Sequence, residues 1–510
     1  MRMRVSLRSG LWIILAFSLA NLTAFVVLDR IAPAGKRLAK VKGEDPVNYF
    51  GIAHSILFDH DFNLNNEYEH MPPDGRSWTL NQPATGLPGS PWGLGYSFLE
   101  IPLLALGTGV DALAGNPADG YSHWAVYIYC IGSVILTGLG LAALFLLLRD
   151  VGEFMGITSD NTRSGVALLV ALAIFLGTNV GYYSFSEMCH GATFLFANLF
   201  LLCWWRSRDT DSWRAWLLLG IVGGFLSICR WQDVLYLGGP VIYDLLSGDR
   251  IRRLAWWRNR SLYAAGVGLW WIPQLLEWKA IYGKWLTIPQ GGGIFSFPPS
   301  HMLQVLFSSQ NGWFVWTPIT ILGVVGLLLG VFRSSRVFAP WIVVLTLQLA
   351  VVGSIPFWSG AEAFGSRYML SNLPLIAVGL VVVFALSGVW LRRGLALACV
   401  ACCVFTSLFA VQFRLNLVPE TTPLTVSELL TDKLRLNQVR KRRQAEKVAR
   451  QSLANGDPAA AIRILEATFD LGDDRSVDQC LIDASRAAGD KGRTEAAEAR
   501  YQRLLESRLY

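Results

Sequence analysis

The hydrophobic residues of this chain fall into long runs that are separated by short polar segments. An α-helix needs roughly 17 to 25 apolar residues to cross the hydrocarbon core of a bilayer. The runs predict about eleven spanning helices, at residues 10–29, 124–148, 164–182, 190–205, 214–229, 234–247, 261–280, 313–331, 338–356, 370–390 and 394–411. The pattern therefore predicts an all-α, polytopic membrane protein.

Composition agrees with this prediction. Of the 510 residues, 53% are hydrophobic and only 16% are charged, which is too few for the surface of a soluble protein of this length. The 20 Trp and 15 Tyr suit the aromatic belts at the two membrane interfaces. The net charge of +7 comes from basic residues in short loops, a distribution that reflects membrane orientation and gives no reason to expect nucleic-acid binding. The eight cysteines have neither metal-site nor disulfide spacing.

Charge also predicts the orientation of the chain. The basic N-terminus MRMRVSLR and the loops at 333–336 and 391–394 fall on one side if each span crosses once, which makes that side cytoplasmic. The apolar segment 91–110 would invert every later loop if it crossed, so we expect it to lie at the outer interface or to re-enter there. A long external loop is thus predicted at about residues 31–123. The first apolar run lacks a small-x-small cleavage site, which favours a retained helix over a signal peptide.

The hydropathy falls sharply near the end of the chain. Residues 413–510 predict two or three amphipathic helices, with Ala at helical spacing and Gly-Asp turns, which resemble a degenerate tetratricopeptide pair. A stable solenoid usually needs at least three repeats, so a cap on the membrane domain and a module that binds a protein partner both stay open. We predict a transmembrane domain at 1–412 and a soluble helical domain at 413–510, on the external side because the number of spans is odd.

Two adjacent carboxylates open the external loop, in the sequence GEDPVNY at 43–49. An acid before a proline is a common helix start, so on local grounds Asp45 caps a helix and Glu44 is solvated. Their place in a long, acidic, Pro-rich outer loop directly after the first span points to chemistry instead.

The segment GEDPVNYFGIAHSILFDHDFNLNNEY at 43–68 resembles the first external loop of GT-C glycosyltransferases. The likeness is to bacterial relatives of protein O-mannosyltransferases and aminoarabinose transferases, in glycosyltransferase family 39 and its neighbours. The segment QPATGLPGSPWGLGYSFLEIPLLAL at 82–106 is similar to the Pro-rich turn and juxtamembrane helix that follow in that family. The resemblance covers about residues 10–400.

This resemblance implies a GT-C bundle with juxtamembrane helices in the external loop, and a polyprenyl-phosphate sugar donor. It carries the role of general base to the pair Glu44 and Asp45, of which we choose Asp45 first and Glu44 second, and places Tyr49 at the family's aromatic position. The chain departs from the family at 81–83, where Asn-Gln-Pro stands in place of a second acid or a basic residue. That departure concerns the way in which the leaving phosphate is held.

The implied reaction defines further candidate residues. An inverting transfer needs a carboxylate to take the acceptor proton and cations to stabilise the phosphate that leaves. Arg230 and Arg367 are the predicted phosphate ligands because a guanidinium binds phosphate through two hydrogen bonds; snorkelling to the interface is the alternative for Arg367. The other substrate-site candidates are polar or aromatic residues expected on the outer face: Tyr49, His54, Glu187, His190, Gln232, Asp233, Lys279, Gln290, His301 and Glu362.

A divalent cation such as Mg²⁺ or Mn²⁺ is a further hypothesis. His54, Asp59 and Asp61 could join Asp45 around it, since carboxylates are hard oxygen ligands, whereas a solvated helix end is the alternative. The requirement for a metal stays open at this point.

The sequence thus predicts a hexosyl- or pentosyltransferase in a bacterial cytoplasmic membrane. It would move a sugar from a polyprenyl-phosphate donor to a lipid, glycan or protein acceptor on the external face. One alternative is a transporter or flippase of lipid-linked saccharide, which would use the same charged groups as a binding site. Another is a non-catalytic membrane scaffold whose C-terminal helices recruit a protein partner.

Overall fold

A computed structural model describes residues 5–32, 37–73, 79–248, 254–419, 422–471 and 474–506. Within these ranges the regular structure is helical, and the pairing of extended backbone is limited to one β-bridge, between Asn81 and Pro88. The predicted all-α class is confirmed. The predicted external loop falls partly outside the described residues, at 33–36 and 74–78.

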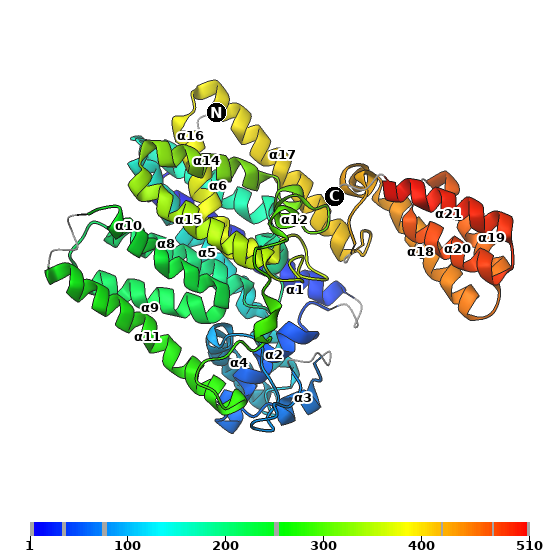
Figure 1. Cartoon of the computed structure of the whole chain (residues 1–510), viewed down its shortest axis with the longest axis horizontal. Coiled ribbons are helices and arrows are strands. Elements are labelled where there is room, and N and C mark those ends of the chain that lie inside the picture. Colours follow the sequence, from blue (N-terminus) through cyan, green and yellow to red (C-terminus); the bar gives the residue numbers. More distant parts are fainter. Residues whose placement is uncertain are drawn as a thin grey trace. The chain divides into compact units, whose positions relative to one another are not determined.

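The chain forms two compact units (Figure 1). The first unit comprises Met1–Met302, Pro318–Trp358 and Arg367–Cys403, and the second comprises Leu303–Thr317, Ser359–Ser366 and Val404–Tyr510. The helix α17 (Val389–Arg414) passes from the first unit to the second. The domain boundary expected at residue 412 lies near the end of that helix and stays a prediction.

Helices follow one another along the whole chain. Those up to residue 282 are α1 (Leu7–Ile31), α2 (Glu44–His54), η2 (Ser55–Asp59), α3 (Asn65–His70), α4 (Gly95–Leu113), α5 (His123–Phe154), α6 (Asp160–Gly177), α7 (Val180–Tyr183), α8 (His190–Ser207), α9 (Trp213–Cys229), η3 (Trp231–Leu237), α10 (Gly238–Leu245) and α11 (Leu254–Tyr282). After them come η5 (Gly292–Ile294), α12 (Met302–Phe307), α13 (Trp313–Trp316), α14 (Ile319–Arg333), α15 (Ser335–Gly353), η6 (Arg367–Asn372), α16 (Leu373–Leu386) and α17. The chain ends in η7 (Ser427–Thr431), η8 (Asp432–Leu434), α18 (Leu436–Ala454), α19 (Pro458–Glu466), η9 (Phe469–Leu471), α20 (Arg475–Ala487) and α21 (Lys491–Glu506).

Seven of the described helical segments are long and apolar enough to cross a membrane: α1, α4, α5, α6, α15, α17, and η6 together with α16. The predicted spans on α8, α9, α11 and α14 fall outside that set because these helices are shorter or less apolar. Since α4 meets the same criteria of length and hydropathy, its expected place at the outer interface stays a prediction.

The single span predicted at 234–247 is wrong as one helix. A 3₁₀ segment, η3, comes first, and the short helix α10 follows it. The sequence Gly-Gly-Pro at 238–240 explains the division. Pro240 lacks the N–H that a continuing helix would need, and it is tolerated where it stands, in the first turn of a new helix.

Small residues allow neighbouring helices of the first unit to approach closely, as is common among helices packed in membranes. A Cβ atom built on Gly326 of α14 would overlap the carbonyl oxygen of Gly379 in α16. In the same way Gly220 of α9 lies against the backbone of α11 at Tyr263. These contacts fix the distance between helices that the apolar runs alone leave undetermined.

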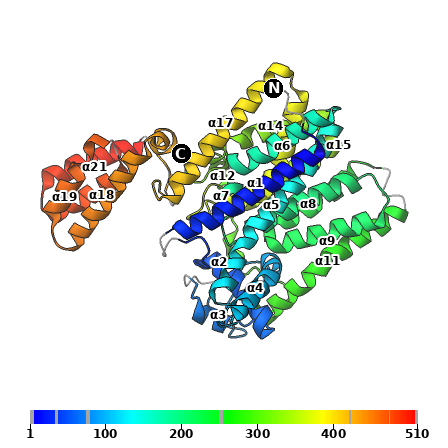
Figure 2. The same ribbon diagram turned by 180° about the vertical axis from the view of Figure 1, so that it is seen from behind.

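The helices α2, α3 and α4 lie together at one end of the first unit, as both views show (Figures 1 and 2). The helix α2 begins after Gly43, whose φ of 88° favours glycine, and it carries Glu44 and Asp45 in its first turn, where the helix dipole stabilises negative charge. Almost the whole of α2 is buried, including Glu44, which is 5% exposed. The solvated Glu44 of the local sequence argument is therefore excluded.

The tail of the second unit is built from four described α-helices, α18 to α21, rather than the two or three predicted. Gly456 and Gly489 both have positive φ and end the helices before them, which creates the additional turns. The four helices share a core of small and aliphatic residues, among them Ala449, Leu465 and Leu481.

Candidate active site

The centre of the candidate site is an ion pair between residues 322 positions apart. Arg367 Nη1, at the start of η6, donates to Asp45 Oδ2, in the first turn of α2, over 3.0 Å. The side chains are 13% and 15% exposed, so the pair is mostly shielded but open on one side. Arg367 points to a carboxylate and does not snorkel to the interface.

A second guanidinium adjoins this pair. Arg230, between α9 and η3, donates from Nη1 to the backbone oxygen of Arg367 over 3.0 Å and lies over the ring of Tyr368. Among the described residues Arg230 forms no ion pair, and the buried Nε of Arg367 donates no hydrogen bond. Two cations thus adjoin the Asp45 carboxylate, the buried Asp233 carboxylate lies within electrostatic range of Arg230, and the Nε donor of Arg367 is unused. Such a site favours an anionic ligand.

The segment before α8 lines the same site. Met188 Sδ lies 3.8 Å from Arg367 Nη1, and His190 Nδ1 lies 3.5 Å from Arg230 Nη1. Glu187 is buried and interacts with Cys130. The sequence predicted Glu187 and His190 but missed Met188, because a methionine carries no signal of chemistry; its only sequence signal is its position between them.

Tyr49 lies beneath the site rather than in it. Its ring is 2% exposed, meets Tyr96 edge to face at 5.2 Å and stacks with Trp92 at 6.4 Å. Burial, with smaller contributions from Cys189 and Asp45, raises the pKa of Tyr49 well above its usual value. Tyr49 therefore stays a protonated phenol that packs α2 against α4 and the residues just before it.

The two adjacent acids are presented differently. Glu44 is buried, whereas Asp45 keeps a partly open carboxylate beside both guanidiniums. Neighbouring residues on an α-helix point about 100° apart, which explains why one acid enters the helix packing and the other enters the site. The geometry thus favours Asp45 over Glu44 as the reacting group, in the order that the sequence argument gave.

Gln232 and Asp233 connect η3 to η6 and so position the two arginines. Gln232 Nε2 donates to the backbone oxygen of Tyr368 over 2.5 Å. Asp233 is fully buried, and its Oδ1 accepts from Ser371 Oγ over 2.7 Å and from Gln348 Nε2 over 3.1 Å. Both predicted residues therefore lie near the site; Gln232 contacts the backbone of η6, whereas Asp233 contacts side chains of η6 and α15.

Four of the sequence candidates have contacts elsewhere. Lys279 is exposed and donates to the backbone oxygen of Gly283 over 2.9 Å. Gln290 donates to the backbone oxygen of Pro91 over 2.6 Å, and the ring of His301 stacks on Trp358. The fourth, Glu362, is exposed and belongs to the second unit.

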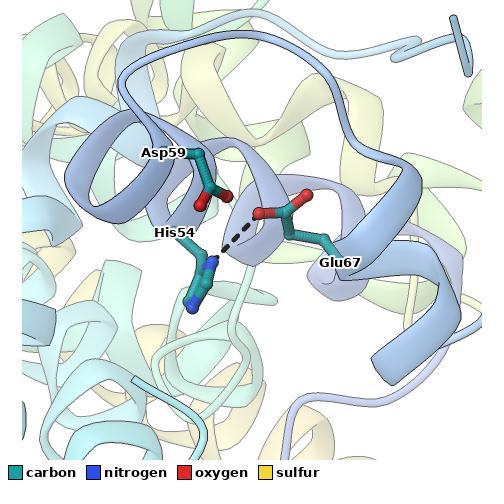
Figure 3. Close-up of side chains that lie close together, drawn as sticks. All are labelled: His54, Asp59 and Glu67. Atoms are coloured by element: carbon teal, nitrogen blue, oxygen red, sulfur yellow. Dashed lines mark hydrogen bonds and ion pairs between the residues drawn. The ribbon is translucent and has the colours of Figure 1, made fainter. Parts of the chain in front are cut away.

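The proposed cation ligands separate into three places. Asp45 pairs with Arg367, and Asp61 Oδ1 accepts from Ser55 Oγ and from the backbone N–H of Asn63, each over 2.9 Å. His54 and Asp59 do come together, and Glu67 of α3 joins them (Figure 3). Glu67 was not among the predicted ligands because its distance from His54 along the chain, 13 residues, fits no simple motif.

Two solved structures of a GT-C glycosyltransferase are similar to this chain over most of its length. Both are of ArnT, an aminoarabinose transferase, from Cupriavidus metallidurans. The structure in the apo state matches with a TM-score of 0.47 and 13% identity, over 96% of this chain and 76% of the ArnT chain. The structure bound to undecaprenyl phosphate matches with a TM-score of 0.43 and 13% identity, over 94% and 77%. No protein-family model and no curated protein matches the chain.

Proposed function

We propose that this chain is a membrane glycosyltransferase that takes a sugar from a polyprenyl-phosphate donor and passes it to a hydroxyl group of an acceptor on the external face. The observation that carries the proposal is the pair of Asp45 and Arg367 beside Arg230. A partly open carboxylate and two guanidiniums in a shielded site supply a base and an anion-binding group within reach of one another.

The donor phosphate is assigned to the two arginines. A guanidinium offers paired N–H donors that match two phosphate oxygens, and the unused Nε of Arg367 has no other acceptor among the described residues. The phosphate of such a donor is a diester with a charge of about −1, and it gains a second negative charge when the sugar leaves, so the two guanidiniums would stabilise the leaving group more strongly than the donor. The donor phosphate would also compete with Asp45 for Arg367 and so release the carboxylate when the donor binds.

Asp45 is assigned as the general base. The acceptor oxygen attacks the anomeric carbon while its proton passes to Asp45 Oδ2, and the bond from that carbon to the phosphate oxygen breaks. The electron pair of that bond leaves with polyprenyl phosphate, whose charge the two guanidiniums stabilise. This displacement inverts the configuration of the sugar carbon.

The surroundings suit a lipid-linked donor. Asp45 opens α2, which follows the apolar helix α1 after a short connection, and Arg367 opens the apolar segment through α16. Side chains along α1 such as Leu15 and Leu19 are exposed and apolar, as expected for a face in contact with lipid. A phosphate at the ends of such helices can be bound while its polyprenyl chain stays in the bilayer.

The test is a turnover assay with membrane vesicles that contain the full chain, a panel of labelled polyprenyl-phosphate sugars, and cell extract as the source of acceptor. We expect release of free polyprenyl phosphate together with transfer of the label to a second product. Relocation of the intact donor across the membrane without cleavage would instead identify a transporter. A cellular function that survives replacement of both Glu44 and Asp45 but is lost on deletion of residues 440–510 would identify a scaffold.

A further inference from the structure

A second cluster of reactive side chains lies in the predicted external loop, separate from Asp45 and Arg367. His54 ends α2, Asp59 ends η2, and Glu67 lies in α3, and one ligand atom of each lies within 4.8 Å of the others. The carboxylates of Asp59 and Glu67 face each other beside the ring of His54 (Figure 3). In the part of the chain that the structure describes, this is the one group of three or more His, Cys, Asp or Glu side chains with such spacing.

The hydrogen bonds of His54 fix the state of its ring. Nε2 lies 2.9 Å from the backbone oxygen of Asp119, which only accepts, so Nε2 carries a proton. Nδ1 of a neutral ring then presents a lone pair to Glu67 Oε1 at 3.0 Å. Two lone pairs at that distance repel each other unless both atoms contact a cation, either a proton on the line between them or a metal ion beside them. An imidazole whose far nitrogen donates to a backbone carbonyl is the usual arrangement of a histidine that ligates a metal.

Glu67 provides the second observation. Its side chain is 1% exposed, and its Oε2 is buried with no hydrogen-bond partner among the described residues. Asn66 Nδ2 donates to Asp59 Oδ2 over 2.9 Å and to Glu67 Oε1 over 3.2 Å, but a neutral amide cannot offset two negative charges. The Tyr121 hydroxyl, 3.4 Å from His54 Nδ1, is beyond the normal range of an O–H donor.

A shared proton is the competing occupant of the cluster. Burial raises the pKa of Glu67, whereas the hydrogen bond from Asn66 is the main cause that lowers the pKa of Asp59. A smaller contribution comes from a hydrogen bond between the two carboxyl groups, which raises the pKa of Glu67 and lowers that of Asp59, as expected for a proton shared by the pair. A metal ion and a shared proton are therefore the two alternatives for this cluster.

We propose that His54, Asp59 and Glu67 bind a divalent transition-metal ion of the class of Zn²⁺ or Mn²⁺. The ligands would be His54 Nδ1 and one oxygen of each carboxylate, whose two charges balance the ion. Two ligand atoms 3.0 Å apart with bonds of about 2.0 to 2.2 Å subtend about 90° at an ion, the angle of octahedral coordination, which Mn²⁺ adopts readily and to which a zinc site would adjust by a few tenths of an ångström. One imidazole nitrogen with carboxylate oxygens favours a transition metal over the Mg²⁺ of the sequence argument.

The local fold explains how these residues meet. In an α-helix, residues five apart point about 140° away from each other. From Ser55 to Asp59 the helix widens to π geometry, in which hydrogen bonds join residues five apart, so Asp59 turns back toward His54. The ion would fasten the end of α2 to α3 and, through His54 Nε2, to the loop at Asp119. Because α2 carries Asp45 at its other end, the ion would also hold the helix that presents the base.

Metal analysis of the purified full-length protein in detergent, supplied with Zn²⁺ and Mn²⁺ and then dialysed, tests the proposal. We expect close to one ion per chain in the wild type and at least about a fivefold loss in His54→Gln and Glu67→Gln. The matched controls are Glu69→Gln, on the same helix, and His60→Asn, in the adjoining turn; both residues are exposed and should leave the metal content unchanged.

Cobalt absorption of the wild type provides a readout that does not depend on a variant that folds. Visible d–d bands should appear at one equivalent of Co²⁺ and disappear on addition of Zn²⁺. A wild type without bound metal and without cobalt bands would overturn the proposal in favour of a shared proton, as would full metal content in Glu67→Gln. Neither readout requires sugar transfer, so the two proposals can fail independently.

Discussion

Replacement of Asp45 by Asn is the most informative change to this molecule. Asn keeps the shape of the side chain and can still accept a hydrogen bond from Arg367, but it carries no charge and cannot accept the proton of an acceptor hydroxyl. A positioned general base contributes about 10²- to 10⁴-fold to a rate, which corresponds to about 3 to 5 kcal/mol of the barrier. We therefore expect turnover to fall by at least about 100-fold.

The effect of the same change on stability should be modest. Exposed ion pairs contribute about 0 to 1 kcal/mol, and loss of one member of a fully buried pair costs about 3 to 5 kcal/mol. The pair of Asp45 and Arg367, with side chains 15% and 13% exposed, lies between these limits. An Asn that preserves one hydrogen bond should cost about 1 to 2 kcal/mol, within the typical stability of about 5 to 15 kcal/mol of a folded domain.

The assay is release of polyprenyl phosphate by vesicles that contain equal amounts of each protein. Asp61→Asn is the matched control because it removes an exposed carboxylate from the same predicted external loop, and its turnover should stay within about threefold of the wild type. A thermal midpoint in detergent reports on folding. Turnover of a folded Asp45→Asn variant within about tenfold of the wild type would refute the assignment of the base.

Three other changes test separate parts of the structure. Arg230→Lys keeps the charge but loses the paired donors, so we expect the KM for the donor to rise by about tenfold or more, with a smaller change in kcat; an unchanged KM would remove Arg230 from the phosphate site. Gly326→Ala should lower the thermal midpoint by several degrees because its Cβ would overlap Gly379, whereas Gly165→Ala, on an open helix face, should not; equal midpoints would contradict the close packing of α14 and α16. Lys433 is buried in the second unit, where its Nζ lies 3.1 Å from Gln412 Oε1, and burial lowers its pKa to about 7. Because the unfolded chain then binds the additional proton, stability should rise as the pH increases from about 7 toward 10.5, by up to about 1.4 kcal/mol per pH unit. A Lys433→Met variant with the same change in thermal midpoint between pH 7 and pH 9 as the wild type would exclude this effect.

Local pattern was sufficient for much of the fold. The apolar runs predicted helical spans because the backbone of a segment buried in a bilayer must satisfy its own hydrogen bonds, and a helix does so. An apolar composition over a sufficient length is therefore enough to predict such a helix. The start of α2 followed from two acids and a proline in its first turn. The division at 234–247 was missed because an apolar run hides a change of helix type, and only the Gly-Gly-Pro sequence signalled it.

The sequence by itself also determined which side chains are candidates for the site. Asp45, Arg230 and Arg367 were selected by residue type and by their positions at the ends of apolar runs. The order chosen for the two adjacent acids, Asp45 first and Glu44 second, did not follow from those signals, since the two residues are chemically alike.

Tertiary structure decided which of these groups meet. Asp45 contacts Arg367 across 322 residues, and Asp233 contacts Ser371 across 138, because the packing of helices brings the segment from α9 to η3 and the segment of η6 to the same end of the first unit. The same packing buried Glu44, left Asp45 partly open, and brought Glu67 of α3 to His54 and Asp59 in place of Asp61. Composition and helical period act over one or two turns of chain, whereas a site requires distances between side chains on different helices, and those distances are set only when the helices pack.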